Sequence, residues 1–167
     1  GNLTVADNVK IALHNQRNQN VFDVLFRTKR FRNDEKRIEQ KVENLLSLFS
    51  IYEKKDELAK NLPYGEQRKL EIVRALASKP SLLLLDEPAA GMNPQETLEL
   101  MNLIAFIRKE FDVTILLIEH DMNLVMGICE RLIVLDFGRI IAGGFPEEIK
   151  KNPAVIKAYL GEEALNA

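Results

Sequence analysis

The chain has 167 residues, of which 46% are hydrophobic and 29% charged, and its formal net charge is −2. These fractions are typical of a folded, cytosol-type protein, and the charge gives no general reason to expect a nucleic-acid partner. The single cysteine excludes an internal disulfide. The apolar runs are far shorter than the roughly 20 residues that span a bilayer. The sequence therefore predicts that the chain does not insert into a membrane directly, and that any association with a membrane goes through a partner.

The first feature along the chain is a basic run. Residues 27–32 read RTKRFR, and Phe22, Phe26 and Phe31 are interleaved with these cations. The interpretation from the residues alone is a solvated basic face beside core aromatics.

Two longer helices are predicted next. In residues 33–49 the apolar side chains recur at helical spacing and form one stripe, with Asn33 or Asp34 as the cap. A second helix is expected from residue 64 or 65 to residue 77, because this stretch is rich in helix formers and a proline follows it.

In the second half, short apolar runs alternate with helical stretches. The runs cover residues 82–86, 113–119 and 132–136, and a helix capped by Asn93 lies between the first two. This alternation is typical of α/β folds with a mostly parallel sheet, whose buried strands are apolar on both faces. Residues 137–144 predict a turn and a short edge strand.

These patterns divide the chain into three parts. Residues 1–80 are predicted to be mainly helical, residues 81–146 to form a sheet with flanking helices, and residues 147–167 to form a helical tail.

Asp86 and Glu87 directly follow the leucine run of the first predicted strand. A charge at the end of a buried strand is costly unless a metal, a ligand or a hydrogen-bond network satisfies it. Ligands of open α/β sheets sit beyond the carboxyl ends of the strands, where Glu119 and His120 also fall. Two adjacent acids suit metal-assisted phosphoryl transfer, in which one holds Mg²⁺ and the next orients the attacking water. The alternative is that both carboxylates cap the following turn.

The stretch LPYGEQRKLEIVRAL, residues 62–76, places a glycine-containing turn directly before a helix. Free backbone N–H groups and the helix dipole make such a place suitable for an anion such as phosphate. Glycine and proline also occur before helices for backbone reasons only, and this alternative stays open.

The motifs follow one another in a specific order: LPYGEQ, then LLLLDEP, then AGMNP, then IEHD. In this order and spacing the chain strongly resembles the nucleotide-binding subunit of ATP-binding cassette (ABC) transporters over nearly its whole length. AAGMNPQET, LLIEHDMNLVMGICERL and NPAVIKAYLGEE resemble the cassettes of branched-chain amino acid importers in particular, with the lipopolysaccharide-export cassette as the nearest competing relative. The resemblance implies a partial P-loop NTPase fold, in which residues 1–80 are the helical signature subdomain and residues 81–146 the C-terminal part of a RecA-like ATPase core.

The resemblance also implies roles for the residues after the strands. Asp86 helps to hold Mg²⁺, Glu87 polarises the hydrolytic water, and His120 contacts the γ-phosphate of ATP. Without the resemblance, a histidine after a strand is more often a capping or surface residue. Asn93 belongs to a loop, residues 91–93, that crosses the dimer interface, and the same side chain suits a helix cap.

Tyr64, Gly65, Glu66 and Gln67 match the family's signature loop, which closes over the γ-phosphate of a nucleotide bound by the opposite subunit. Pro63 stands where the consensus has Ser. Backbone N–H groups, chiefly that of Gly65, are therefore expected to supply more of the phosphate contact.

The phosphate-gripping motif G-x-x-x-x-G-K-[ST] does not occur in the sequence. We therefore interpret the chain as the C-terminal part of a longer subunit and expect no ATPase activity from it alone. A sheet cut beside its core strand exposes an apolar edge, so the isolated chain is expected to be poorly soluble or oligomeric.

For the whole subunit the resemblance implies ATP and Mg²⁺ as cofactors, a second cassette and transmembrane permease subunits as partners, and a place at the inner face of the cell membrane. The basic run then lies near the groove that receives the permease's coupling helix. Two other interpretations are a soluble cassette ATPase lobe, whose relatives insert long coiled coils before the signature, and a non-catalytic interaction fragment.

Overall fold

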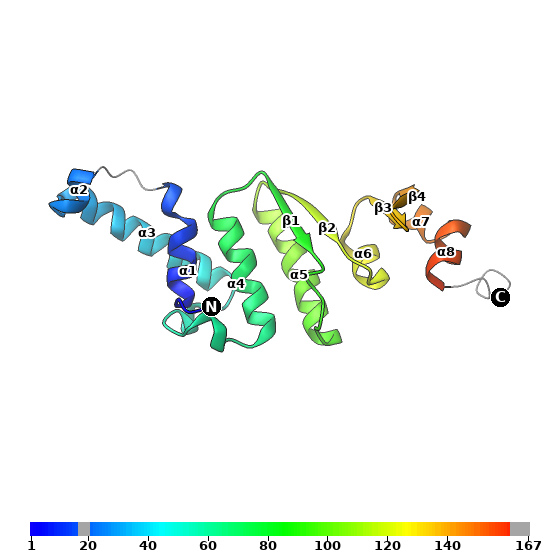
Figure 1. Ribbon diagram of the computed structural model, residues 1–167, viewed down its shortest axis with the longest axis horizontal. Coiled ribbons are helices and arrows are strands. Elements are labelled where there is room, and N and C mark those ends of the chain that lie inside the picture. The colour runs from blue at the N-terminus through cyan, green and yellow to red at the C-terminus, as the bar shows by residue number, and fades with distance from the viewer. Residues whose placement is uncertain (17–20, 161–167) are drawn as a thin grey trace. The chain divides into compact units, whose positions relative to one another are not determined.

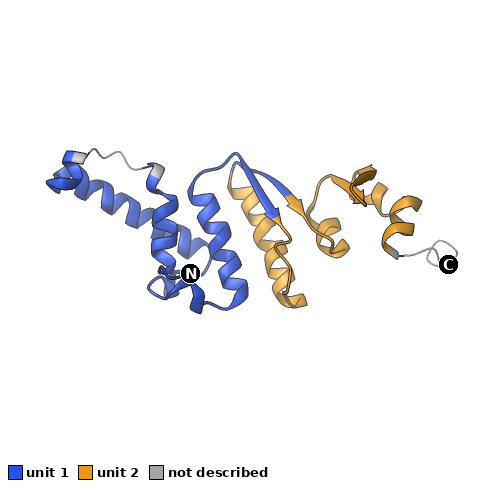
Figure 2. Ribbon diagram, viewed as in Figure 1, with its two compact units in different colours: residues 1–85, 112–116 blue, residues 86–111, 117–167 orange. Residues whose placement is uncertain are grey.

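The computed structural model describes residues 1–16 and 21–160 (Figure 1). Two compact units can be distinguished: unit 1 contains residues 1–85 and 112–116, and unit 2 contains residues 86–111 and the chain from residue 117 onward (Figure 2). The helical elements are α1 (Val5–Ala12), η1 (His14–Gln16), α2 (Val21–Leu25), α3 (Lys29–Leu48), η2 (Tyr52–Lys54), η3 (Ala59–Asn61), α4 (Tyr64–Ala77), α5 (Pro94–Glu110), α6 (Met122–Ile128), α7 (Pro146–Ile149) and α8 (Pro153–Leu160). The strands are β1 (Leu82–Asp86), β2 (Thr114–Ile118), β3 (Leu132–Asp136) and β4 (Arg139–Gly144).

The core of unit 1 lies between α1, α3 and α4, which pack on one another. The predicted apolar stripe of α3 is confirmed, since Ile38, Val42 and Leu46 are buried. Buried side chains on or directly after α1 and on α4 complete this core, namely Val5, Val9, Leu13, Leu70, Val73 and Leu76. Burial of these aliphatic groups is the main source of stability for the unit.

The predicted start of α3 is wrong by one turn. The helix begins at Lys29 because Thr28 acts as its cap, with the Thr28 hydroxyl oxygen accepting a hydrogen bond from the Phe31 N–H at 3.3 Å. Asp34, a predicted cap, is instead buried inside the helix and pairs with Arg37. Part of the basic run therefore forms the first turn of α3.

β1 and β2 form a two-stranded sheet. The Thr114 N–H donates to the Ser81 carbonyl at 3.0 Å, and the Glu87 N–H donates to the Ile118 carbonyl at 2.9 Å. Both partners advance together along the chain, so the strands run parallel. Leu83 and Leu85 are buried while the alternate positions of β1 are exposed, so only one of the two apolar faces expected from the sequence is covered within the described residues.

The turn and short strand predicted for residues 137–144 are confirmed. The expectation that residues 132–136 belong to a mostly parallel sheet is wrong in the described part of the chain: β3 pairs antiparallel with β4 in a second two-stranded sheet, because a two-residue turn joins them, and a bulge lies between Val134 and Leu135. Phe137 and Gly138 make the turn, both with positive φ (45° and 75°), the conformation that matches the twist of two-residue hairpins. Side chains of β3 and β4 pack with α7 and α8 around Ile149.

α5 and α6 pack together in unit 2 through buried side chains, among them Ile104, Ile107 and Leu124. Cys129 follows α6 and is half-buried, and this burial raises the pKa of its thiol. The end of the predicted tail, residues 161–167, lies outside the described residues. Within the described ranges, no helix is both long and apolar enough to cross a bilayer.

Candidate functional site

The turn after β1 presents two carboxylates. Asp86 is the last residue of β1, and its exposed carboxylate has no hydrogen-bond or ion-pair partner among the residues that the structure describes. Glu87 adopts a left-handed conformation (φ 42°) while its N–H remains bonded to β2. Since only glycine adopts such a φ readily, the chain turns sharply here at some conformational cost.

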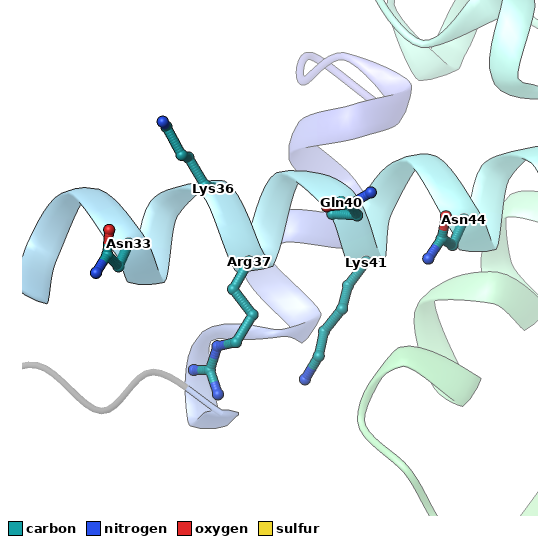
Figure 3. Close-up of a pocket in the computed structure, with 6 residues that line it drawn as sticks. All are labelled: Asn33, Lys36, Arg37, Gln40, Lys41 and Asn44. Carbon is teal, nitrogen blue, oxygen red and sulfur yellow. The ribbon is translucent and has the colours of Figure 1, made fainter.

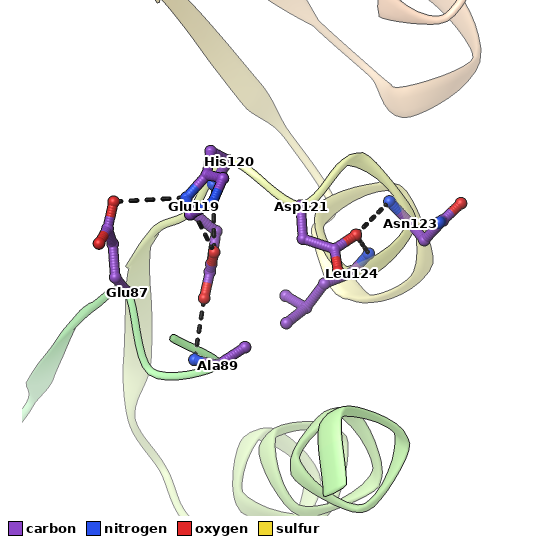
Figure 4. Close-up of polar contacts among 7 residues, drawn as sticks. All are labelled: Glu87, Ala89, Glu119, His120, Asp121, Asn123 and Leu124. Carbon is purple, nitrogen blue, oxygen red and sulfur yellow. Dashed lines mark hydrogen bonds and ion pairs between the residues drawn. The ribbon is translucent and has the colours of Figure 1, made fainter. Parts of the chain in front are cut away.

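Glu87 and His120 contact each other across the ends of the two strands. Nδ1 of His120 lies 3.3 Å from Oε1 of Glu87 (Figure 4), and both side chains are largely exposed. Both side chains are therefore accessible to water. The sequence-predicted pair is therefore brought together.

The Glu119 side chain connects the two turns that carry Glu87 and His120. Its side chain is only 1% exposed. One carboxylate oxygen accepts from the Ala89 N–H at 2.9 Å, and the other accepts from the His120 N–H at 3.1 Å (Figure 4). The carboxylate thus ties the turn after β1 to the turn after β2. The sequence motifs assign no role to Glu119; the available signal is an acid directly before a histidine at a strand end.

The segments that follow both turns are anchored by helix caps. The Asp121 carboxylate accepts from the N–H groups of Asn123 and Leu124 and starts α6. The predicted cap at Asn93 is confirmed as a capping box, because its side chain accepts from the Glu96 N–H while Glu96 accepts from the Asn93 N–H. These caps define the ends of both loops.

The signature-like residues lie in unit 1, at the start of α4, which begins at Tyr64 as predicted. Pro63 makes no side-chain cap, so the N–H groups of Tyr64 and Gly65 have no acceptor in the part of the chain that is described. Such unpaired donors at a helix start suit an anion.

The side chains of this segment are engaged locally. Glu66 pairs with Lys54 at 2.6 Å, and the amide of Gln67 donates to the Leu62 carbonyl at 2.8 Å. The Tyr64 hydroxyl accepts from Arg68 at 2.7 Å. In this segment, only the backbone N–H groups of Tyr64 and Gly65 are therefore left to contact a phosphate.

No group of three or more His, Cys, Asp or Glu side chains that could hold a metal occurs among the described residues. Proteins usually bind Mg²⁺ through one or two carboxylates together with waters and substrate phosphates. The partnerless carboxylate of Asp86 is suited to that role.

A shallow hollow of about 450 Å³ lies on α3 and is lined by Asn33, Lys36, Arg37, Gln40, Lys41 and Asn44 (Figure 3). Two of its three cations have partners: Arg37 donates to the Gln16 carbonyl and Lys41 to the Gln16 side-chain oxygen. Burial, followed by the charge of Arg37, lowers the pKa of Lys41. None of the sequence-predicted site residues lines this hollow.

Residues 2–90 match the sequence profile of a family described as ABC transporter. The chain belongs to this family. Residues 139–164 also match a profile described as branched-chain amino acid ATP-binding cassette transporter. Together the two matches cover both ends of the chain, in agreement with the resemblance seen in its motifs.

Two curated relatives represent the importer and exporter alternatives. The chain is 47% identical, over 96% of its length, to the high-affinity branched-chain amino acid transport ATP-binding protein LivG of Salmonella typhimurium. It is 38% identical, over 75% of its length, to the lipopolysaccharide export system ATP-binding protein LptB of Acidithiobacillus ferridurans. The chain spans 63% of the first relative and 52% of the second.

Among solved structures, the chain resembles cbiO1 from Clostridium perfringens, part of the ABC transporter complex cbiONQ. The TM-score is 0.75 at 28% identity, and the match covers 99% of this chain and 60% of that chain. The predicted class, a partial P-loop NTPase fold of the ABC type, is confirmed.

Proposed function

We propose that this chain forms part of an ATP-hydrolysing subunit that powers import of branched-chain amino acids, and that it supplies the signature segment and the LLLLDEP segment of that subunit. The higher identity and coverage for the LivG relative favour this substrate class over the lipopolysaccharide-export alternative. The match of residues 139–164 to the branched-chain profile supports the same choice. The observation that carries the hydrolytic role is the contact of Glu87 with His120 above the buried Glu119.

Each residue of the site then has a chemical role. Glu87 accepts a hydrogen bond from the attacking water and polarises it, while His120, 3.3 Å away, orients that water and contacts the γ-phosphate. Asp86 would hold Mg²⁺, which neutralises charge on the phosphates when bound. Glu119 keeps the carboxylate and the imidazole in register.

The signature segment serves a nucleotide on a second cassette. The N–H groups of Tyr64 and Gly65 donate to its γ-phosphate, and the Glu66 and Gln67 side chains stabilise the loop through Lys54 and Leu62. In this proposal residues 1–80 are the signature subdomain, residues 81–146 belong to the ATPase core and residues 147–167 are the tail. Asn93 lies in the loop that crosses between cassettes. The assembly also contains permease subunits and lies at the inner face of the membrane.

A soluble cassette ATPase lobe is less well supported. Relatives of that kind carry long coiled coils before the signature, whereas the longest helix described before α4 is α3, with 20 residues. No described feature favours this second candidate.

The test uses this chain joined to the phosphate-gripping region of the LivG relative, because the 167 residues lack that motif. We expect ATP hydrolysis by the joined subunit, none by the chain alone, and a loss of at least about 100-fold for Glu87→Gln, which removes the water-polarising carboxylate. Glu110→Gln, the same change at an exposed position on α5, is the control and should keep activity. Full hydrolysis by the Glu87→Gln subunit contradicts the proposal.

A further inference from the structure

Four large apolar side chains are exposed on and beside α2. Phe22 is 71% exposed, Leu25 71% and Phe26 68%, and Val24 is also exposed; we call these four residues the α2 patch. The Phe22 and Phe26 rings stack with centroids 6.2 Å apart. The interpretation of this segment as core aromatics is therefore wrong for both phenylalanines.

Cations border the α2 patch. Arg27, Lys29, Arg30 and Arg32 are all exposed. The acid within the patch sequence, Asp23, is buried. As a result, every exposed charged side chain between residues 22 and 33 is positive.

Local hydrogen bonds fix this segregation of charge. The Thr28 hydroxyl donates to the Asp23 carboxylate at 2.7 Å and accepts from the Phe31 N–H at the start of α3. Arg30 lies 4.0 Å from the same carboxylate. Asp23 is thereby held inward, while the apolar and cationic side chains face outward on one short segment.

We propose that the α2 patch and its bordering cations contact the headgroup layer of an anionic lipid bilayer. Aromatic and aliphatic side chains beside lysine and arginine are the composition that binds the interface of anionic membranes, where apolar burial and charge attraction act together. A bilayer surface is uniformly negative over a wide area, as this segment is uniformly positive. A specific protein surface more commonly presents both signs of charge. The contact extends the sequence-based expectation of membrane association through a partner, and it does not depend on ATP hydrolysis.

The chain contains no tryptophan, so a single Trp reports on one place. Phe26→Trp in the full chain is titrated with vesicles of phosphatidylcholine, with and without phosphatidylserine. We expect a blue shift of the emission with the anionic vesicles only, reversed by high salt because the attraction is screened. The control Phe137→Trp places the fluorophore at a fully exposed position in the β3–β4 turn and should show no shift.

Charge reversal provides the second arm, measured by co-sedimentation of the full chain with the same vesicles. Arg27→Glu with Lys29→Glu and Arg32→Glu should weaken binding to anionic vesicles by at least about tenfold. The control Lys150→Glu with Lys151→Glu changes two exposed lysines in unit 2 and should bind as the parent does. Far-UV circular dichroism checks that all variants fold.

Three results overturn the proposal. The first is an equal blue shift from Trp at position 137, which indicates non-specific association with the vesicles. The second is equal binding to neutral vesicles, which removes the role of charge. The third is no binding to either vesicle, which leaves an acidic protein segment as the occupant of the patch.

Discussion

Burial gives the two glutamates at the strand ends different roles. The Glu87 side chain is exposed, and within the described part of the chain its carboxylate contacts only His120, so it remains available to water. The Glu119 side chain is buried, and both of its oxygens accept backbone hydrogen bonds from the two turns. A buried carboxylate that holds two turns through backbone hydrogen bonds is a positioning group rather than a group that touches substrate.

Glu119→Gln tests this distinction. Glutamine keeps one acceptor and turns an N–H₂ donor toward a backbone N–H, so one charge-assisted bond is lost. We expect the free energy of unfolding to fall by roughly 2 kcal/mol. Urea denaturation of the chain measures the change, with Glu87→Gln as the control because an exposed carboxylate contributes little to stability. Equal stability of the two variants would show that Glu119 does not hold the turns together.

The site could be predicted from sequence only in part. Asp86, Glu87 and His120 were identified because their order and spacing match known motifs, and the structure brings Glu87 and His120 into contact. The role of Glu119 could not be predicted, because its burial depends on two turns that are distant in sequence meeting in space. Its partner is the backbone N–H of Ala89, and a backbone group cannot be recognised from the type of residue that carries it.

At the scale of the elements, helix caps determine where the loops of unit 2 end. Asn93 forms both halves of a capping box with Glu96 at the start of α5. We expect Asn93→Ala to lower the free energy of unfolding by about 1 kcal/mol. Asn93→Asp keeps the acceptor and should leave stability unchanged. Comparing the two variants therefore separates the effect of the helix cap from any role of Asn93 between cassettes.

Urea denaturation of the chain gives the stability of each variant, and ATP hydrolysis of the joined subunit gives its activity. If both variants are as stable as the parent, the capping box does not stabilise α5. If Asn93→Asp alone lowers hydrolysis at full stability, the position acts beyond its cap.

Element boundaries were predictable where local chemistry sets them. β1 and the start of α5 lie where the leucine run and the Asn93–Pro94 signal place them. The start of α3 was missed because Thr28, inside the basic run, caps the helix earlier than the polar residues after it. Whether Phe22 and Phe26 are core or surface residues could not be decided from sequence, since an aromatic residue gives no sign there of which side it faces.

For the molecule as a whole, one face of the β1–β2 pair presents apolar side chains to solvent. Leu84 on β1 and Leu116 on β2 are exposed, although leucine is the kind of residue that a buried strand uses. The sequence predicted an exposed apolar edge, and the structure locates this surface on a face of the sheet. An exposed apolar surface of this kind favours association.

Leu84→Lys with Leu116→Lys should therefore raise the monomer fraction of the isolated chain in size-exclusion chromatography. The added charges remove the apolar face and repel a second copy at positions where a lysine side chain reaches water. The control Leu98→Lys changes an exposed leucine on α5 and should leave the elution profile as it was. An unchanged profile for the double variant would mean that another surface drives association.

The two hydrogen bonds accepted by Glu119 also limit how this protein can be engineered. The two turns cannot be treated as separate modules, because one side chain completes both. A designer who grafts the turn after β1 from another cassette must retain a carboxylate at position 119, or transplant both loops as a single cassette part.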